Sequence, residues 1–179
     1  RLGSGEVGDR QERLRLHGSA AAALEQLYAD DPEPHLAELA HHFVATASGG
    51  DVDKAIDYAT RAGDDASGSL AYEEAARLYE MALETSGLAT PINEHMRCKL
   101  LLSLGDAQAR GGDIAAAKDT FAQSAELARR LDEPEQMARA VLGYGGRFVW
   151  FRAGSDRRLI PLLEDALRGL PEPGLLRAR

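Results

Sequence analysis

The glycines near the amino end are the first residues whose spacing suggests chemistry. Gly3, Gly5 and Gly8 fit the GxGxxG spacing of a dinucleotide-binding loop, which requires a strand before it and a helix after it. Only two residues precede Gly3, and Glu6 would repel a phosphate. We therefore predict a flexible linker at 3–8. A GxxxxGK[ST] phosphate loop is absent from the chain.

The histidines and carboxylates form no recognisable catalytic or metal-binding set. His41 and His42 are adjacent, and neighbouring side chains on a helix point about 100° apart, so the two do not share one ion. We expect one of them beneath the first helix and the other in solvent, while His17, His35 and His95 stand alone. No GxSxG elbow is present, and the acidic pairs are typical of helix caps and solvated faces. The prediction is a non-enzymatic segment without a cofactor or metal.

Composition favours an all-α protein. The 179 residues include 31 Ala and 25 Leu but only 14 Val, Ile and Thr, and strands are enriched in β-branched residues. The net charge of −8 argues against nucleic-acid contact by this segment. No apolar run reaches the roughly 18 residues of a membrane span. A single cysteine, Cys98, fits a reducing compartment, so we expect a cytoplasmic protein.

Proline, glycine and capping residues divide the chain into about eight helices. They place helices at about 9–29, 35–47, 52–66, 70–86, 91–110 and 114–131, with two more capped by Asp132 and Ser155. The fifth is expected to start at Pro91, behind a Thr90 cap. An apolar face of the first helix comprises Leu16, Ala20, Ala23, Leu24 and Leu27, and that of the second comprises Leu36, Leu39, Ala40 and Phe43.

An internal repeat is the strongest signal. At an offset of 42 residues Gly63 falls on Gly105, and the next helix repeats a small–aromatic–small pattern. Its members are Ala75, Tyr79 and Ala82, which fall on Ala117, Phe121 and Ser124. This is the tetratricopeptide pattern, in which small residues let two helices approach and the aromatic ring fills the space between hairpins. A third unit departs from it, because the offset places Arg147 at the glycine position, although Gly143 lies four residues earlier.

These patterns predict an all-α, tetratricopeptide-like right-handed superhelix of antiparallel helix hairpins. We expect a helical lead-in over 1–50, repeats over 51–170 and the truncated start of another helix over 171–179. The repeats are predicted at 51–87, 91–131 and 134–170.

Partner-binding residues are predicted on the first helices of the repeats, which line the concave face of such arrays. They are Asp57, Asp64, Lys99, Asp106 and Arg110, together with Tyr144, Arg147, Trp150 and Arg152 around the aromatic cluster at 148–151. Four consecutive large apolar residues wrap a helix on all sides. The cluster is therefore either buried against the next helix and the next repeat or part of a recognition surface.

Two segments resemble a known family. They are RLRLHGSAAAALEQLYADDPEPHLAELAHHFVATA, from Arg13, and DKAIDYATRAGDDASGSLAYEEAARLYEMALE, from Asp53. Over about 10–170 the chain is similar to the helical region of actinobacterial large ATP-binding LuxR-type transcriptional regulators and their cyclase- or kinase-linked relatives. The resemblance implies an ATPase module before this segment and often a helix-turn-helix domain after it. No catalytic or DNA-contacting residue of that family carries over to this chain.

The resulting hypothesis is a non-catalytic sensor or protein-interaction segment of a cytoplasmic, ATP-dependent transcriptional regulator. It would bind a small-molecule inducer or a partner protein, with no contact to nucleic acid or membrane. The alternative is a passive scaffold or dimerisation segment of a cyclase- or kinase-linked signalling protein.

Overall fold

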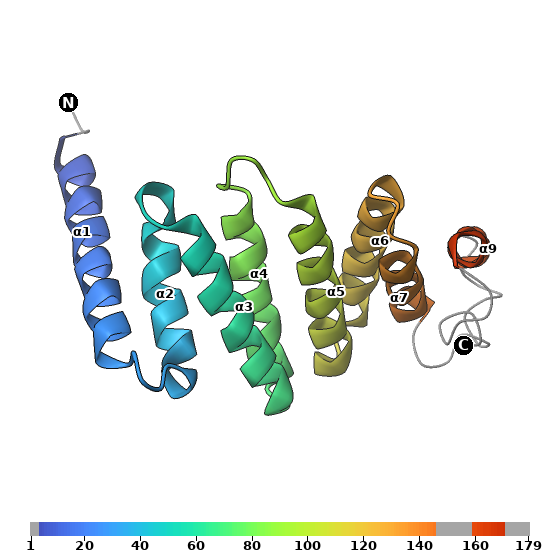
Figure 1. The fold of residues 1–179 in the computed structure, drawn as a ribbon, viewed down its shortest axis with the longest axis horizontal. Coiled ribbons are helices and arrows are strands. Elements are labelled where there is room, and N and C mark those ends of the chain that lie inside the picture. Colours follow the sequence, from blue (N-terminus) through green and yellow to red (C-terminus); the bar gives the residue numbers. More distant parts are fainter. Residues whose placement is uncertain (1–3, 146–158, 171–179) are drawn as a thin grey trace. The chain divides into compact units, whose positions relative to one another are not determined.

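The computed structural model describes residues 4–145 and 159–170, and all of its regular elements are helices (Figure 1). They are α1 (Ser4–Leu27), α2 (Leu36–Thr46), α3 (Val52–Gly68), α4 (Tyr72–Ser86), α5 (Glu94–Gly111), α6 (Ile114–Arg130), α7 (Pro134–Gly145) and α9 (Leu159–Gly169). Short 3-10 turns, η1 (Glu33–His35) and η2 (Ala47–Gly49), flank α2. The all-α prediction is confirmed. Within the described ranges, no helix combines the length and apolar character of a membrane span.

The chain divides into two compact units, Arg1–Ile92 and Asn93–Arg179. In the first unit, α1 packs on α2, α2 on α3, and α3 on α4. In the second, α5 packs on α6, α6 on α7, and α7 on α9. Each predicted repeat encloses one pair of these packed helices. The right-handed superhelical stacking stays a prediction.

Contacts between glycines and aromatic rings hold the hairpins together. A Cβ atom on Gly63 of α3 would lie 2.7 Å from Cε1 of Tyr79 on α4, and one on Gly105 of α5 would lie 2.8 Å from Cε1 of Phe121 on α6. The Phe121 ring also lies against Gly143 of α7, which takes the place of the missing glycine at the 42-residue offset. Both rings are almost fully buried, at 3% and 2% exposure. The repeat pattern therefore corresponds to two equivalent contacts.

Helix α1 packs with a different face from the one that its apolar pattern predicts. Leu16 and Leu27, at the ends of the predicted stripe, are 58% and 71% exposed, whereas Ala21 is buried. The helix lies mainly on α2, and its small residues Gly18 and Ala21 allow the closer approach. The stripe predicted for α2 is confirmed, since all four of its residues are buried.

Two predicted helix starts are wrong because other groups cap the backbone. Helix α5 begins at Glu94 rather than Pro91, and the Asn93 side chain accepts a hydrogen bond of 3.0 Å from the backbone N–H of Met96. Asp132 does not cap α7, because its φ of 56° is left-handed and it closes α6 instead.

The predicted linker at 3–8 is also corrected. Helix α1 begins at Ser4 and continues through Gly8. Glycine weakens a helix without forbidding it, so the GxGxxG spacing here belongs to a helix.

The turn between α3 and α4 uses an unfavourable residue. Leu70 has a φ of 64°, in the left-handed region, and is 69% exposed. Its equivalent at the 42-residue offset is Gly112, with a φ of 94°. Left-handed backbone costs a residue with a Cβ atom about 1–2 kcal/mol relative to glycine.

Gly105→Ala should lower the free energy of unfolding by about 1–3 kcal/mol, because the new methyl group overlaps the buried Phe121 ring. Urea denaturation followed by circular dichroism measures this. Gly68→Ala is the matched control, since no atom lies within 4 Å of its added Cβ. Equal effects of the two substitutions would contradict the proposed packing role.

Leu70→Gly should raise the free energy of unfolding by about 1 kcal/mol, because it relieves the left-handed strain without loss of a buried contact. The same denaturation experiment applies, with Leu88→Gly as the control. Leu88 is also exposed but is not left-handed, so its substitution should give no gain. A loss of stability in Leu70→Gly would contradict the equivalence with Gly112.

Candidate functional site

The predicted site residues of the first unit, Asp57 and Asp64, lie on α3, and both have hydrogen-bond partners. The Asp57 carboxylate accepts a 3.4 Å hydrogen bond from Arg61, which also pairs with Glu33 at 2.5 Å. The Asp64 carboxylate accepts a 2.6 Å hydrogen bond from the hydroxyl of Tyr79. Asp64 therefore fixes the repeat's aromatic side chain, whatever else it contacts.

In the second unit, α5 carries Lys99, Asp106 and Arg110, all exposed. Spacings of seven and four residues bring them to one face of that helix. Desolvation raises the pKa of the Asp106 carboxyl, and the positive charge of Arg110 one turn later partly offsets this shift. The face is charged and open to solvent, and its role as a partner-binding surface stays a prediction.

The aromatic cluster is described only at its edge. Tyr144 of α7 is 7% exposed, and Nζ of Lys118 lies 5.0 Å from its ring centroid. Tyr144 is therefore a core residue with Lys118 over its ring, rather than an open recognition residue. Arg147, Trp150 and Arg152 lie outside the described residues.

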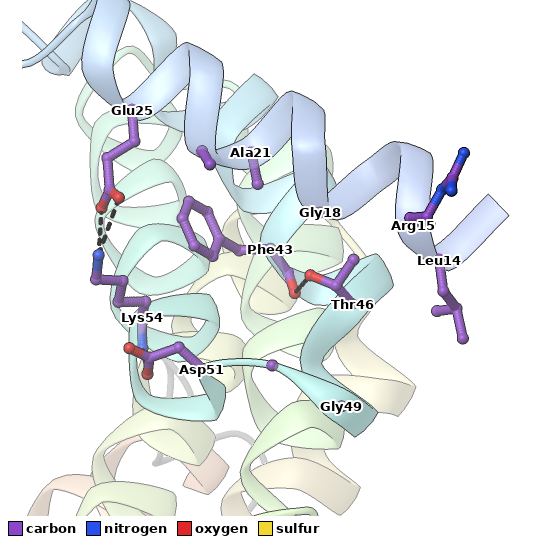
Figure 2. Close-up of a pocket in the computed structure, with 12 residues that line it drawn as sticks. Leu14, Arg15, Gly18, Ala21, Glu25, Phe43, Thr46, Gly49, Asp51 and Lys54 are labelled. Carbon is purple, nitrogen blue, oxygen red and sulfur yellow. Dashed lines mark hydrogen bonds and ion pairs between the residues drawn. The ribbon is translucent and has the colours of Figure 1, made fainter. Parts of the chain in front are cut away.

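The first unit contains a cleft that the sequence did not reveal. Its volume is about 510 Å³, and it lies between α1, α2 and the start of α3 (Figure 2). Its apolar wall includes Leu14, Ala21, Ala22 and Phe43, and its polar rim includes Arg15, Glu25, Thr46, Asp51 and Lys54. Three glycines, Gly18, Gly49 and Gly50, complete the lining. A cleft of this size is within the usual range for small-ligand sites.

An ion pair closes one end of the cleft (Figure 2). Nζ of Lys54 donates to both Glu25 oxygens, at 2.8 and 2.9 Å, and the Tyr58 hydroxyl donates to Glu25 at 2.9 Å. The bond from Lys54 lowers the pKa of Glu25, and the bond to Glu25 raises the pKa of Lys54. Burial and the bond to Glu25 raise the pKa of Tyr58 to about 12. The ring of Phe43 stacks on Tyr58, with centroids 5.1 Å apart.

The cleft offers groups that could bind a ligand. It combines an aromatic and aliphatic wall with charges that are largely paired with each other. Among the described residues, no group of three His, Cys, Asp or Glu side chains is placed to hold a metal ion. The arrangement suits an amphipathic ligand or a partner side chain.

Sequence reasoning missed this cleft because its polar members are far apart along the chain. Glu25 and Lys54 are separated by 29 residues and lie on different helices, so no local motif joins them. The Gly49-Gly50-Asp51 turn borders the cleft, but residues of these types are also typical of a helix end followed by an N-cap. Asp51 does cap α3, accepting a 3.0 Å hydrogen bond from the backbone N–H of Lys54.

The prediction that His17 stands alone is wrong, because this histidine contacts α2. Its Nδ1 lies 3.0 Å from Nδ1 of His42, and both side chains are partly buried. The neighbouring His41 is exposed, so the expectation of one packed and one solvated histidine is confirmed.

Comparison with known proteins gives no family. No family model matches the chain, and no curated protein is significantly similar to it.

Tyr58→Phe should lower the free energy of unfolding by about 1 kcal/mol at pH 8, because it removes the hydrogen bond to Glu25. Since the folded-state pKa of Tyr58 lies above its ordinary value of 10, this stabilisation is complete below about pH 10 and is lost as the pH rises toward 12. Tyrosinate absorbance and urea denaturation across this range measure both effects. Tyr28→Phe is the control, and an unchanged alkaline titration in Tyr58→Phe would contradict the assignment.

Proposed function

We propose that the chain is a non-catalytic recognition segment that binds a small-molecule inducer or a partner protein. The observation that carries this proposal is the pair of equivalent contacts, Gly63 with Tyr79 and Gly105 with Phe121, which support a tetratricopeptide-like repeat. In proteins of stacked helical repeats, each hairpin buries its core against its neighbours. The faces that are not used for stacking form an extended surface for binding.

The cleft beside α1 supports the same proposal. An aromatic wall formed by Phe43, with Lys54 and Glu25 at one end, offers apolar surface and oriented polar groups together. The charged face of α5 is a second surface to which a partner could bind.

The regulatory context of the proposal rests on the resemblance of the sequence. We infer that this segment belongs to an ATP-dependent transcriptional regulator and couples the signal to its ATPase. The coding sequence on either side tests this inference. A GxxxxGK[ST] loop upstream and a helix-turn-helix domain downstream would support it, whereas a cyclase or kinase domain would keep the sensor role and change the output. The absence of both a phosphate loop and an effector domain would contradict it.

A passive scaffold or dimerisation segment is the alternative, and the exposed Leu16 and Leu27 on α1 favour it. Apolar side chains that are exposed along one helix suit contact with another chain. A ligand that binds the folded state raises the melting temperature, so the absence of any shift across a panel of inducers and partners would favour the scaffold.

Lys99→Glu combined with Arg110→Glu in the complete regulator should change the response of a transcriptional reporter to inducing conditions by about tenfold or more, because a reversed charge on a binding face opposes the partner. The free energy of unfolding should stay within about 0.5 kcal/mol, as expected for exposed positions. Arg129→Glu on α6, another exposed arginine, is the control. An unchanged response in the double variant would exclude the α5 face as the binding surface.

A further inference from the structure

Two histidines join the first helix to the rest of its unit. Nδ1 of His17 on α1 and Nδ1 of His42 on α2 lie 3.0 Å apart, with ring centroids separated by 5.0 Å. The ring of His41 lies beside both, at 5.4 Å from His17 and 5.3 Å from His42. Three imidazoles therefore gather at this contact between helices.

The contact depends on the number of protons that it holds. A neutral imidazole has one nitrogen that donates and one that accepts, so the close Nδ1 pair requires one donor and one acceptor. When both rings are protonated, both Nδ1 atoms carry hydrogens, and two positive charges face each other across the contact. The hydrogen bond is then lost and the helices repel each other.

The surroundings give little compensation for a second positive charge. Burial, His17 and His41 all lower the pKa of His42, and Glu38 of α2 partly opposes them. Among the described residues, α3, η1 and η2 place no charged group that shifts this pKa. On α1, Arg13 lies one turn before His17 and adds positive charge.

Few apolar contacts hold α1 in place. Ala21 is its buried residue among those described, while Leu16 and Leu27 point into solvent. The other attachments are the bonds of Glu25 to Lys54 and Tyr58 and the stack of Tyr28 on His35, with centroids 3.4 Å apart. A contact between two titratable groups therefore makes a large contribution to docking of this helix.

We propose that His17 and His42 form an acid-sensitive latch that holds α1 on α2, and that protonation of both releases α1 and takes apart the cleft, because half of the residues that line it lie on α1. This device goes beyond the proposed recognition function and stands independently of it. It would make formation of the cleft depend on pH.

The direction of the effect follows from the charge balance. A histidine whose pKa is lowered in the folded state stabilises the fold at pH values above its ordinary pKa of 6.5. This stabilisation is lost as the pH falls. The Glu25 carboxylate has a lowered pKa, so its pair with Lys54 stays charged over the same range. The histidine contact therefore supplies the pH dependence in this range, and release of α1 separates Glu25 from Lys54 as a consequence.

Amide hydrogen exchange of the intact chain, followed from about pH 7.5 to about pH 5, tests the latch. After correction for intrinsic exchange, the equilibrium constant for opening of α1 should increase by up to about tenfold for each unit by which the pH falls. This factor applies to each proton that the released state binds in excess of the docked state. Amides of α5 and α6 provide an internal reference. Imidazole nitrogen spectra in parallel should show His17 and His42 titrating as a coupled pair.

His17→Gln is the decisive variant, because it leaves one titratable group in the Nδ1–Nδ1 pair, beside His41, and should abolish most of the acid-dependent opening. His35→Gln is the matched control. This histidine also touches α1, through Tyr28, and lies 4.0 Å from Glu38, yet its replacement should leave the acid-dependent opening in place. Opening of α1 that is independent of pH in the unmodified chain would overturn the proposal, as would an unchanged response in His17→Gln. Independent titration of the two imidazoles in the unmodified chain would overturn it as well, even if the variant fails to fold.

Discussion

The fold depends on the contact between an aromatic ring and a helix that has no side chain at the point of contact. The rings of Tyr79 and Phe121 each lie so close to a glycine that a Cβ atom added to that glycine would overlap the ring. Because protein interiors are packed at the density of organic crystals, such a contact fixes both the distance and the register of the two helices. Phe121 lies against glycines on two neighbouring helices, and thus one ring sets the positions of α5, α6 and α7 in its unit.

The sequence was sufficient to predict this contact because the contact requires particular residue types, a glycine and an aromatic residue, at a fixed spacing. Gly63 and Gly105 occupy equivalent positions, and Tyr79 and Phe121 follow at the same interval, so a 42-residue offset is enough to find them. The glycine of the third unit, Gly143, lies four residues before the strict offset position, one helical turn away. A shift of one turn returns a residue to nearly the same face, and the ring still meets a glycine.

The cleft could not be predicted in the same way. Its polar members belong to helices that meet only in the folded unit, and Glu25, Lys54 and Tyr58 have no spacing rule that joins them. Helix α1 also shows the limit of apolar patterning. Its predicted stripe is exposed at Leu16 and Leu27, because the face that packs on α2 is the one that carries the small residues Gly18 and Ala21. Amphipathic spacing predicts that a helix packs, but small residues decide which face approaches.

The first unit therefore contains two kinds of contact, apolar packing and polar attachment, which respond differently to pH. Between α3 and α4, a buried ring against a glycine is apolar, apart from the bond of the Tyr79 hydroxyl to Asp64, and its packing changes little with pH. Helix α1 is held by contacts that carry protons or charges, the histidine pair with α2 and the Glu25–Lys54 ion pair with α3, and their strength follows the medium. An element that must move needs a low energy of separation, whereas the elements that stay in place need close packing. Polar attachment lets α1 separate, while the contact of Tyr79 with Gly63 keeps α3 and α4 together.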